Sequence, residues 1–212
     1  MWLSKKRKIA PPRADEEQEE IDLPFNLPML FGGGSAHVHI QNNRIYFNDD
    51  ITSESVTLLN KELRHVEEKM LRVGEMYRIP PPPIYLYITT NGGDIYSAFS
   101  VIDCINQLKT EVYTVVDGFV ASAGTLISLA GKKRFILPNA YMLIHELRSG
   151  VWGKMSEITE EYENIKKLMD HLTDYYVKHT KITKKTLEKI LKKDSVWNAE
   201  ECLRRGLVEE TL

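Results

Sequence analysis

One local pattern occurs twice in this chain: a strand-like apolar run ends at a glycine-containing turn and passes directly into a helix-like segment. In the first copy IYLYITT (84–90) leads into NGGD, and apolar residues then recur at helical spacing from Ile95 to Ile105. In the second copy VYTVV (112–116) leads into GFVASAGTLISLAG (118–131). Consecutive strand–helix units predict an α/β fold with a largely parallel sheet and right-handed crossovers. Glycines after two such strands also predict a functional site at the carboxyl ends of the strands.

The segments around these units give further secondary-structure signals. HVHIQNNRIYFND (37–49) alternates around Asn-Asn and predicts a hairpin, and Thr52 suits the N-cap of the amphipathic helix that follows. The run at 84–90 is continuously apolar, so we expect a central strand covered on both faces. Two more strands are expected at RFILP (134–138) and YMLI (141–144).

The last third of the chain has mainly helical patterns. Apolar residues from Ile158 to Tyr175 stand three or four positions apart, which predicts a helix of about six turns. Such a helix is longer than a small sheet can cover, so we expect part of it to project and to pack against another copy of the chain. A short helix is expected at the end, with Asn198 as its N-cap and Gly206 just after its last turn.

Length and composition favour one domain with an N-terminal appendage. A chain of 212 residues is long enough for one well-buried domain, which we assign to residues 37–212. Residues 1–36 combine a basic cluster, an acidic run and a stretch rich in proline and glycine, which predicts a flexible arm. The chain shows no signal peptide and no apolar run long enough to cross a membrane, so we expect a soluble protein.

Charge and cysteine content narrow the function classes. With 28 basic and 30 acidic residues the formal net charge is -2, so the overall charge does not favour nucleic acid or an acidic membrane as a partner. Cys104 and Cys202 stand far apart, which argues against a disulfide framework or a zinc site and favours a cytoplasmic location. His37 and His39 would share one strand face without a third ligand, so we expect surface histidines and no metal site. NGGD is too short for a nucleotide-binding motif, so no cofactor is expected.

Ser122 stands among small residues where the second strand meets its helix. As an N-cap, this serine would contribute about 1 kcal/mol to stability. As a nucleophile, it would need a base within reach and two preorganised oxyanion donors. His145 follows the strand YMLI and would bring an imidazole to the same edge of the sheet. The amides of Gly93 and Ala123 lie in the two strand-to-helix turns and are the expected oxyanion donors.

The residues alone leave the acidic partner of His145 open. A triad needs a carboxylate that orients the imidazole. Asp194 is one candidate because it precedes an apolar Val-Trp pair. Four other carboxylates compete with it on spacing: Asp170, Asp174, Glu146 and Glu157.

Four stretches, in order over roughly residues 44–210, together resemble the proteolytic subunit of Clp protease, the ClpP family of serine peptidases. They are ITTNGGDIYSAFSVIDCINQL, GFVASAGTLISLAG, RFILPNAYMLIHE and DSVWNAEECLRRGLVEE. The resemblance implies a ClpP/crotonase-like fold of repeated ββα units with a protruding handle helix at 156–178. It also implies heptameric rings stacked in pairs around a proteolytic chamber. The roles that it implies are Ser122 as nucleophile, His145 as base, Asp194 as acid, and Gly93 and Ala123 as oxyanion donors.

The chain departs from the family pattern in ways that indicate a divergent or phage-like member. Asn91 stands where the family usually has proline, and Ala123 stands where methionine is common. The stretch after the histidine is glycine-rich in the family, whereas ELRSGVWGKMSE keeps only Gly150 and Gly153. The charged arm replaces the family's N-terminal axial segment. These departures bear on substrate alignment, ring stacking and the docking of a Clp-type ATPase.

The expected activity is that of a serine endopeptidase that cleaves peptides or unfolded proteins inside a homo-oligomeric ring. A Clp-type ATPase would be the partner that uses ATP. One alternative is a crotonase-type acyl-CoA hydratase or isomerase, which needs a carboxylate base and no serine nucleophile. The other is a non-catalytic ring subunit, which would assemble without a reactive Ser122.

Overall fold

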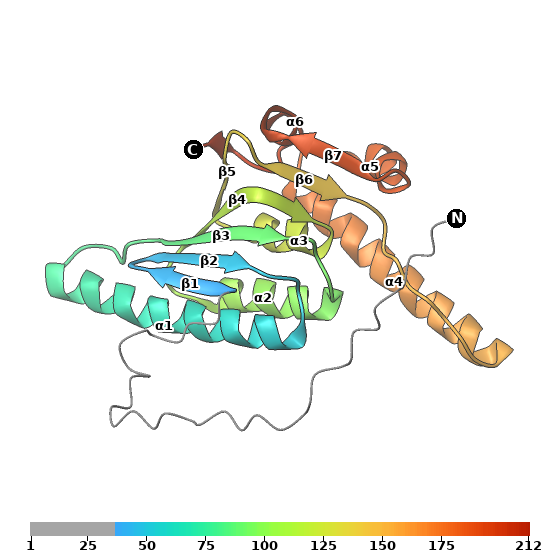
Figure 1. Cartoon of the computed structure of the whole chain (residues 1–212), viewed down its shortest axis with the longest axis horizontal. Helices are drawn as coiled ribbons and strands as arrows, with labels where there is room; N and C mark the ends of the chain where they lie inside the picture. The colour runs from blue at the N-terminus through green and yellow to red at the C-terminus, as the bar shows by residue number, and fades with distance from the viewer. Residues whose placement is uncertain (1–36) are drawn as a thin grey trace, which may run out of the picture. The chain divides into compact units, whose positions relative to one another are not determined.

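The computed structural model describes residues 37–212, which carry a mixed sheet of eight strands (Figure 1). The arm predicted at 1–36 lies outside the described residues. The strands are β1 (Val38–Gln41), β2 (Arg44–Asn48), β3 (Ile84–Thr90), β4 (Val112–Ala121), β5 (Lys133–Ile136), β6 (Tyr141–Ile144), β7 (Ser195–Asn198) and β8 (Glu210–Thr211). The helices are α1 (Ser53–Tyr77), α2 (Ile95–Gln107), α3 (Ala123–Leu129), α4 (Met155–His179), α5 (Lys184–Leu191) and α6 (Ala199–Arg205).

The strand order confirms the predicted α/β fold of repeated strand–helix units. The main path runs β1-β2-β3-β4-β5-β8, and all its neighbours are parallel except for the β1–β2 hairpin. Strand β6 pairs in parallel with β4 and antiparallel with β7. The hairpin turn, the helix that begins after Thr52, and the short last helix capped by Asn198 are also confirmed.

Strand β4 is longer than predicted and divides its pairing between two neighbours. Its first half, Tyr113–Val116, pairs with β5, and its second half, Phe119–Ala121, pairs with β6. We expected the strand to end at 116, but it continues to Ala121 through Gly118, which has φ +65°. Because β6 joins only this second half, the end of β6 lies beside the end of β4.

Helices α1, α2 and α3 lie on the face of the sheet that holds the core. Helices α1 and α3 contact the strands, and α2 packs between these two helices (Figure 1). In β3 the residues Ile84, Leu86 and Ile88 are fully buried, whereas Tyr85 and Tyr87 on the other face are only half-buried. The prediction of a strand covered on both faces was therefore wrong. Neighbouring tyrosines shield each other there instead, as in the stacked pair Tyr46 and Tyr87, whose ring centroids are 4.7 Å apart.

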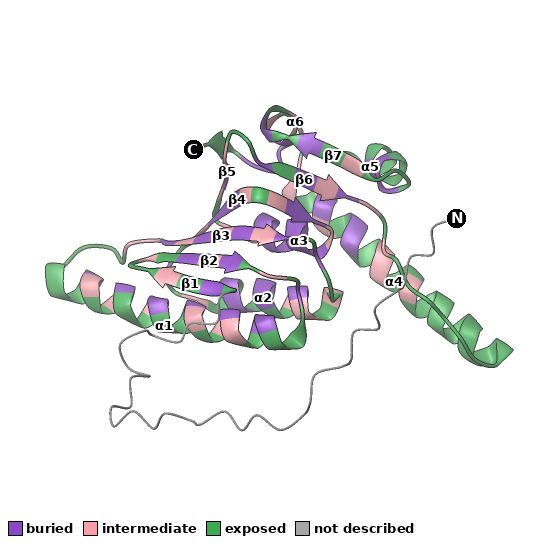
Figure 2. Cartoon of the chain, viewed as in Figure 1, coloured by how far each residue is buried: buried purple, intermediate pink, exposed green. Residues whose placement is uncertain are grey.

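Helix α4 buries one side of its carboxyl-terminal half and is mostly exposed along its other half (Figure 2). Near its carboxyl end, Leu172 and Tyr176 are 7 % and 4 % exposed. At the other end it projects from the sheet, and Met155 and Tyr162 are open to solvent together with Trp152 just before it. The predicted long helix is thus confirmed, and residues 145–154 before it have no regular secondary structure. No helix among residues 37–212 is long and apolar enough to cross a membrane.

Candidate active site

Ser122 forms the turn between β4 and α3 in a conformation that non-glycine residues seldom adopt. Its φ is +53° and its ψ is -126°, and such a conformation costs about 1–3 kcal/mol. Its backbone N–H donates to the carbonyl oxygen of Leu143 in β6 at 2.9 Å. The side chain makes no capping hydrogen bond. The N-cap interpretation therefore fails, and the half-buried hydroxyl is left for another role.

Two glycines allow the backbone segments around Ser122 to approach one another closely. A Cβ atom on Gly92, whose φ is +99°, would lie 2.6 Å from the Cβ of Ser122. A Cβ on Gly124 would lie 2.2 Å from the Cγ2 of Thr90, at the end of β3. Side chains at either position would push the β3 turn away from α3. The two glycines therefore allow the turn after β3 to pack directly against Ser122.

The backbone N–H groups of Gly93 and Ala123 have no acceptor among residues 37–212. The peptides beside Gly93 are held by Ile51, which donates to the Gly92 carbonyl at 2.7 Å and accepts from the Asp94 N–H at 2.8 Å. Ala123 is the first residue of α3, where a helix offers no carbonyl to its N–H. Both residues line the same pocket as Ser122. Two unused donors therefore belong to the pocket that holds the hydroxyl.

His145 follows β6 and lines this pocket as well. Its Nδ1 lies 2.6 Å from the carbonyl oxygen of Glu146. Because a carbonyl oxygen can only accept, Nδ1 carries the hydrogen, and Nε2 of the neutral ring is free to act as a base. Within the described part of the chain no hydrogen bond joins the ring to the Ser122 hydroxyl.

The carboxylate of Asp194 is not bonded to His145 in this structure. Its Oδ2 accepts from Nη2 of Arg148 at 2.6 Å, and both side chains are largely exposed. Among the competing carboxylates, Glu157 bonds to Lys154, and Asp174 lies 3.8 Å from Lys184. No carboxylate among residues 37–212 is hydrogen-bonded to the histidine. The structure thus gathers four of the five predicted site residues, and Asp194 stands outside.

The pocket that these groups share has a volume of about 300 Å³ and an apolar wall. The wall includes Leu126, Met169, Leu172, Tyr176 and Leu191. Sequence reasoning missed these residues because apolar side chains at helical spacing indicate core packing equally well. It also missed Arg148, for which the only signal was its position three residues after the histidine.

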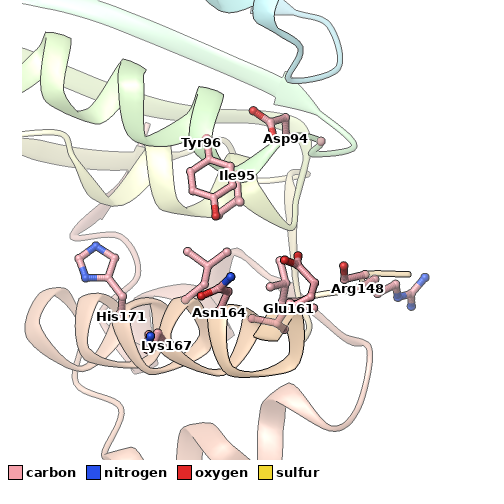
Figure 3. A pocket seen from close by; sticks show the side chains of 13 residues that line it. Asp94, Ile95, Tyr96, Arg148, Glu161, Asn164, Lys167 and His171 are labelled. Atoms are coloured by element: carbon pink, nitrogen blue, oxygen red, sulfur yellow. The ribbon is translucent and has the colours of Figure 1, made fainter. Parts of the chain in front are cut away.

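A second pocket, of about 540 Å³, lies between the start of α2 and the exposed half of α4 (Figure 3). Tyr96 and Ile95 border it from α2, and Asn164 and His171 border it from α4. Four residues line both pockets: Gly93, Ile95, Leu147 and Arg148. The two hollows are therefore adjacent, with Gly93 between them. No group of three or more metal-ligating side chains that could hold an ion occurs among residues 37–212.

Comparisons with known proteins give the family of this chain. Residues 40–212 match the Clp protease family. The chain is 34% identical over 154 residues to ATP-dependent Clp protease proteolytic subunit 2 of Treponema denticola, covering 72% of this chain and 76% of that protein. It is 30% identical over 135 residues to the ATP-dependent Clp protease proteolytic subunit of Deinococcus radiodurans, covering 63% of this chain and 66% of that protein, just under two thirds. The chain therefore belongs to the Clp protease family.

Proposed function

We propose that this chain is a serine endopeptidase in which Ser122 is the nucleophile and His145 is the general base. The observation that carries the proposal is the strained Ser122 turn, which faces a pocket shared with His145 and with two unused backbone donors. Strained backbone that the surroundings hold in place is common where it positions a reactive group. Membership of the Clp protease family supports the same activity.

In the first half of the proposed reaction, Ser122 Oγ attacks the carbonyl carbon of the peptide bond while His145 Nε2 accepts its proton. The carbonyl oxygen becomes an oxyanion, for which the N–H groups of Gly93 and Ala123 are the proposed donors. The intermediate collapses when the C–N bond breaks, and the imidazolium gives its proton to the leaving amine. An ester between Ser122 and the acyl part of the substrate remains.

In the second half, water replaces the amine. His145 takes a proton from the attacking water, and the same two N–H groups stabilise the second oxyanion. The ester bond breaks, the proton returns to Ser122 Oγ, and a carboxylic acid leaves. The Nδ1–H bond to the Glu146 carbonyl supports the assignment of the base, because in the neutral ring it leaves Nε2 as the nitrogen that can accept a proton.

Asp194 is the proposed acidic partner of His145, by analogy with the family. The role requires two changes: the Asp194 carboxylate leaves Arg148, and the imidazole Nδ1–H leaves the Glu146 carbonyl to donate to this carboxylate. The ion pair is exposed, so breaking it costs about 1 kcal/mol or less. An Asp194→Asn variant is then expected to reduce kcat by up to about 10⁴-fold, the order seen when a triad loses its acid.

A homo-oligomeric ring of the family type is the proposed assembly, with a peptide or unfolded protein as substrate. The start of helix α4 and the segment just before it support the ring, because Trp152, Met155 and Tyr162 are 97 %, 79 % and 62 % exposed on the described chain. The two relatives carry the words "ATP-dependent" in their names, so a Clp-type ATPase is the proposed partner, in the cytoplasm. Size-exclusion chromatography with light scattering tests the ring, and a monomer at micromolar concentration would contradict it.

The activity is tested with a fluorophosphonate, which reacts only with activated serines. Intact-mass spectrometry of the treated protein should show one adduct, mapped to Ser122 and missing in Ser122→Ala. Ser55 offers a matched control, because its buried hydroxyl caps α1 and Ser55→Ala should still be labelled. An unlabelled wild-type ring would instead support the non-catalytic subunit, and an unlabelled protein that forms no ring would reopen the acyl-CoA alternative.

A further inference from the structure

A chain of buried hydroxyl groups connects helix α4 with the backbone of Ser122. The phenol oxygen of Tyr176 lies 2.5 Å from Oγ1 of Thr125, in the first turn of α3. Thr125 Oγ1 lies in turn 2.6 Å from the carbonyl oxygen of Ser122. Tyr176 is 4 % exposed and Thr125 is 0 % exposed. These contacts are shielded from water and join elements 51 residues apart in the sequence.

The direction of donation along this chain follows from the number of hydrogens. A carbonyl oxygen only accepts, so Thr125 uses its single hydroxyl hydrogen on Ser122. The phenol of Tyr176 must then donate to Thr125 Oγ1. Burial raises the pKa of Tyr176 to about 12, so the phenol keeps this hydrogen at any ordinary pH.

The carbonyl at the end of the chain belongs to the same peptide group as the Ala123 N–H. In a trans peptide the C=O and N–H bonds point in opposite directions, so holding one fixes the other. The Ser122 oxygen accepts from Thr125 twice, from the hydroxyl at 2.6 Å and from the backbone N–H at 3.0 Å. With this oxygen held toward α3, the Ala123 N–H points away from the helix.

We propose that Tyr176 and Thr125 are positioning residues that fix the Ser122–Ala123 peptide and so aim the Ala123 N–H at the oxyanion. This inference rests on the proposed function, and it adds a dependence of the active site on the placement of α4. Neither residue touches the reacting atoms. A shift of α4 away from α3 would remove the phenol, free the Thr125 hydroxyl to rotate, and loosen the peptide.

The test compares kcat and KM for a fluorogenic peptide in two variants. Losing one oxyanion donor outright costs about 10²- to 10³-fold in rate, so a loosely held donor should cost less. We expect about a tenfold to 100-fold lower kcat for Thr125→Val, a smaller loss for Tyr176→Phe, and KM within about twofold. Thr125→Ser keeps the hydroxyl and should restore kcat. The double variant should be no slower than Thr125→Val alone, because the tyrosine acts through the threonine.

Two matched controls remove comparable hydroxyls that do not reach Ser122. Thr114 Oγ1 donates to the carbonyl of Ser128 at the other end of α3, and Tyr175 OH lies 3.5 Å from the Leu126 carbonyl. Thr114→Val and Tyr175→Phe should therefore keep kcat within about twofold of wild type. If Thr125→Val behaves like these controls, or if the double variant loses the product of the two single effects, the proposal is overturned.

Hydrogen exchange provides a readout that does not require activity. In Thr125→Val the amides of residues 122–126 should exchange at least about tenfold faster than in Thr114→Val. Equal exchange in the two variants would overturn the positioning role. A wild-type protein that neither cleaves peptides nor reacts with a fluorophosphonate would refute the proposed function, and exchange would still decide whether the hydroxyls hold the peptide.

Discussion

The close approach of Gly124 to Thr90 gives a prediction that concerns the packing of the Ser122 turn. A Cβ at position 124 would lie 2.2 Å from the Thr90 Cγ2 methyl, and its next neighbour, Val120 Cγ1, would be 3.2 Å away. In Gly124→Ala one methyl must therefore be displaced. Overpacking of this kind costs about 1–3 kcal/mol, against which alanine gains up to about 1 kcal/mol of helix propensity.

Thr90→Ser removes the methyl that clashes and keeps the hydroxyl that accepts from the Gly92 N–H at 3.0 Å. Alone, this change loses one buried methyl, worth about 1 kcal/mol. Combined with Gly124→Ala, it leaves room for the new methyl, so the double variant should lie within about 1 kcal/mol of wild type. The two sites should thus show a favourable coupling of about 1–3 kcal/mol.

The assay is urea unfolding of the four proteins at one protein concentration, with fluorophosphonate labelling of Ser122 measured in parallel. Gly150→Ala is the control, because no atom lies within 4 Å of its added Cβ and its stability should change by less than about 0.5 kcal/mol. Additive losses in the double variant would refute the packing argument.

Three more predictions concern other parts of the chain. Thr52→Ala removes one half of the capping box of α1 and should cost about 0.5–2 kcal/mol in chemical unfolding. The pKa of Tyr176 is about 12 in the folded state and about 10 when unfolded, so the folded state holds the extra proton. The free energy of unfolding of the wild type should then fall as the pH rises from about 10 to 12. In Tyr176→Phe this fall should be smaller by about 2–3 kcal/mol, and equal pH dependence in the two proteins would contradict this. Arg148→Gln should raise kcat, because it releases the Asp194 carboxylate for the histidine. The free energy of unfolding should change by less than about 1 kcal/mol, since the ion pair is exposed. An unchanged kcat would count against Asp194 as the acid.

The sequence predicted the elements whose patterns are long and regular. The helix from Thr52 and the helix up to His179 each extend over 25 residues, so a weak signal per residue accumulates over several turns. Helix α5 and strands β7 and β8 were not predicted. They have 8, 4 and 2 residues, too few to show a period, and β7 exists as a strand because β6 pairs with it. Such pairing is invisible in a local pattern.

The grouping of the candidate site residues was predictable where it depends on the ends of strands. The strand-to-helix turns place Ser122, Gly93 and Ala123, and a parallel neighbour places His145 beside them. The acidic partner of His145 depends on how side chains orient across loops, and the proposed one, Asp194, accepts a hydrogen bond from Arg148, 46 residues away. The hydroxyl chain from Tyr176 was equally hidden, because a tyrosine at helical spacing indicates core packing until its oxygen is placed.

With Ser122 as the proposed nucleophile, its backbone conformation places stability and activity in opposition at one position. Glycine adopts φ +53° with ψ -126° far more readily than serine does, so glycine there would relieve strain of about 1–3 kcal/mol. A search for heat-resistant variants that scored stability alone would therefore favour replacing the hydroxyl. An engineering programme for this protein would have to hold position 122 constant and gain stability elsewhere. Relatives with glycine at this position would be expected to be more stable and to lack the proposed nucleophile.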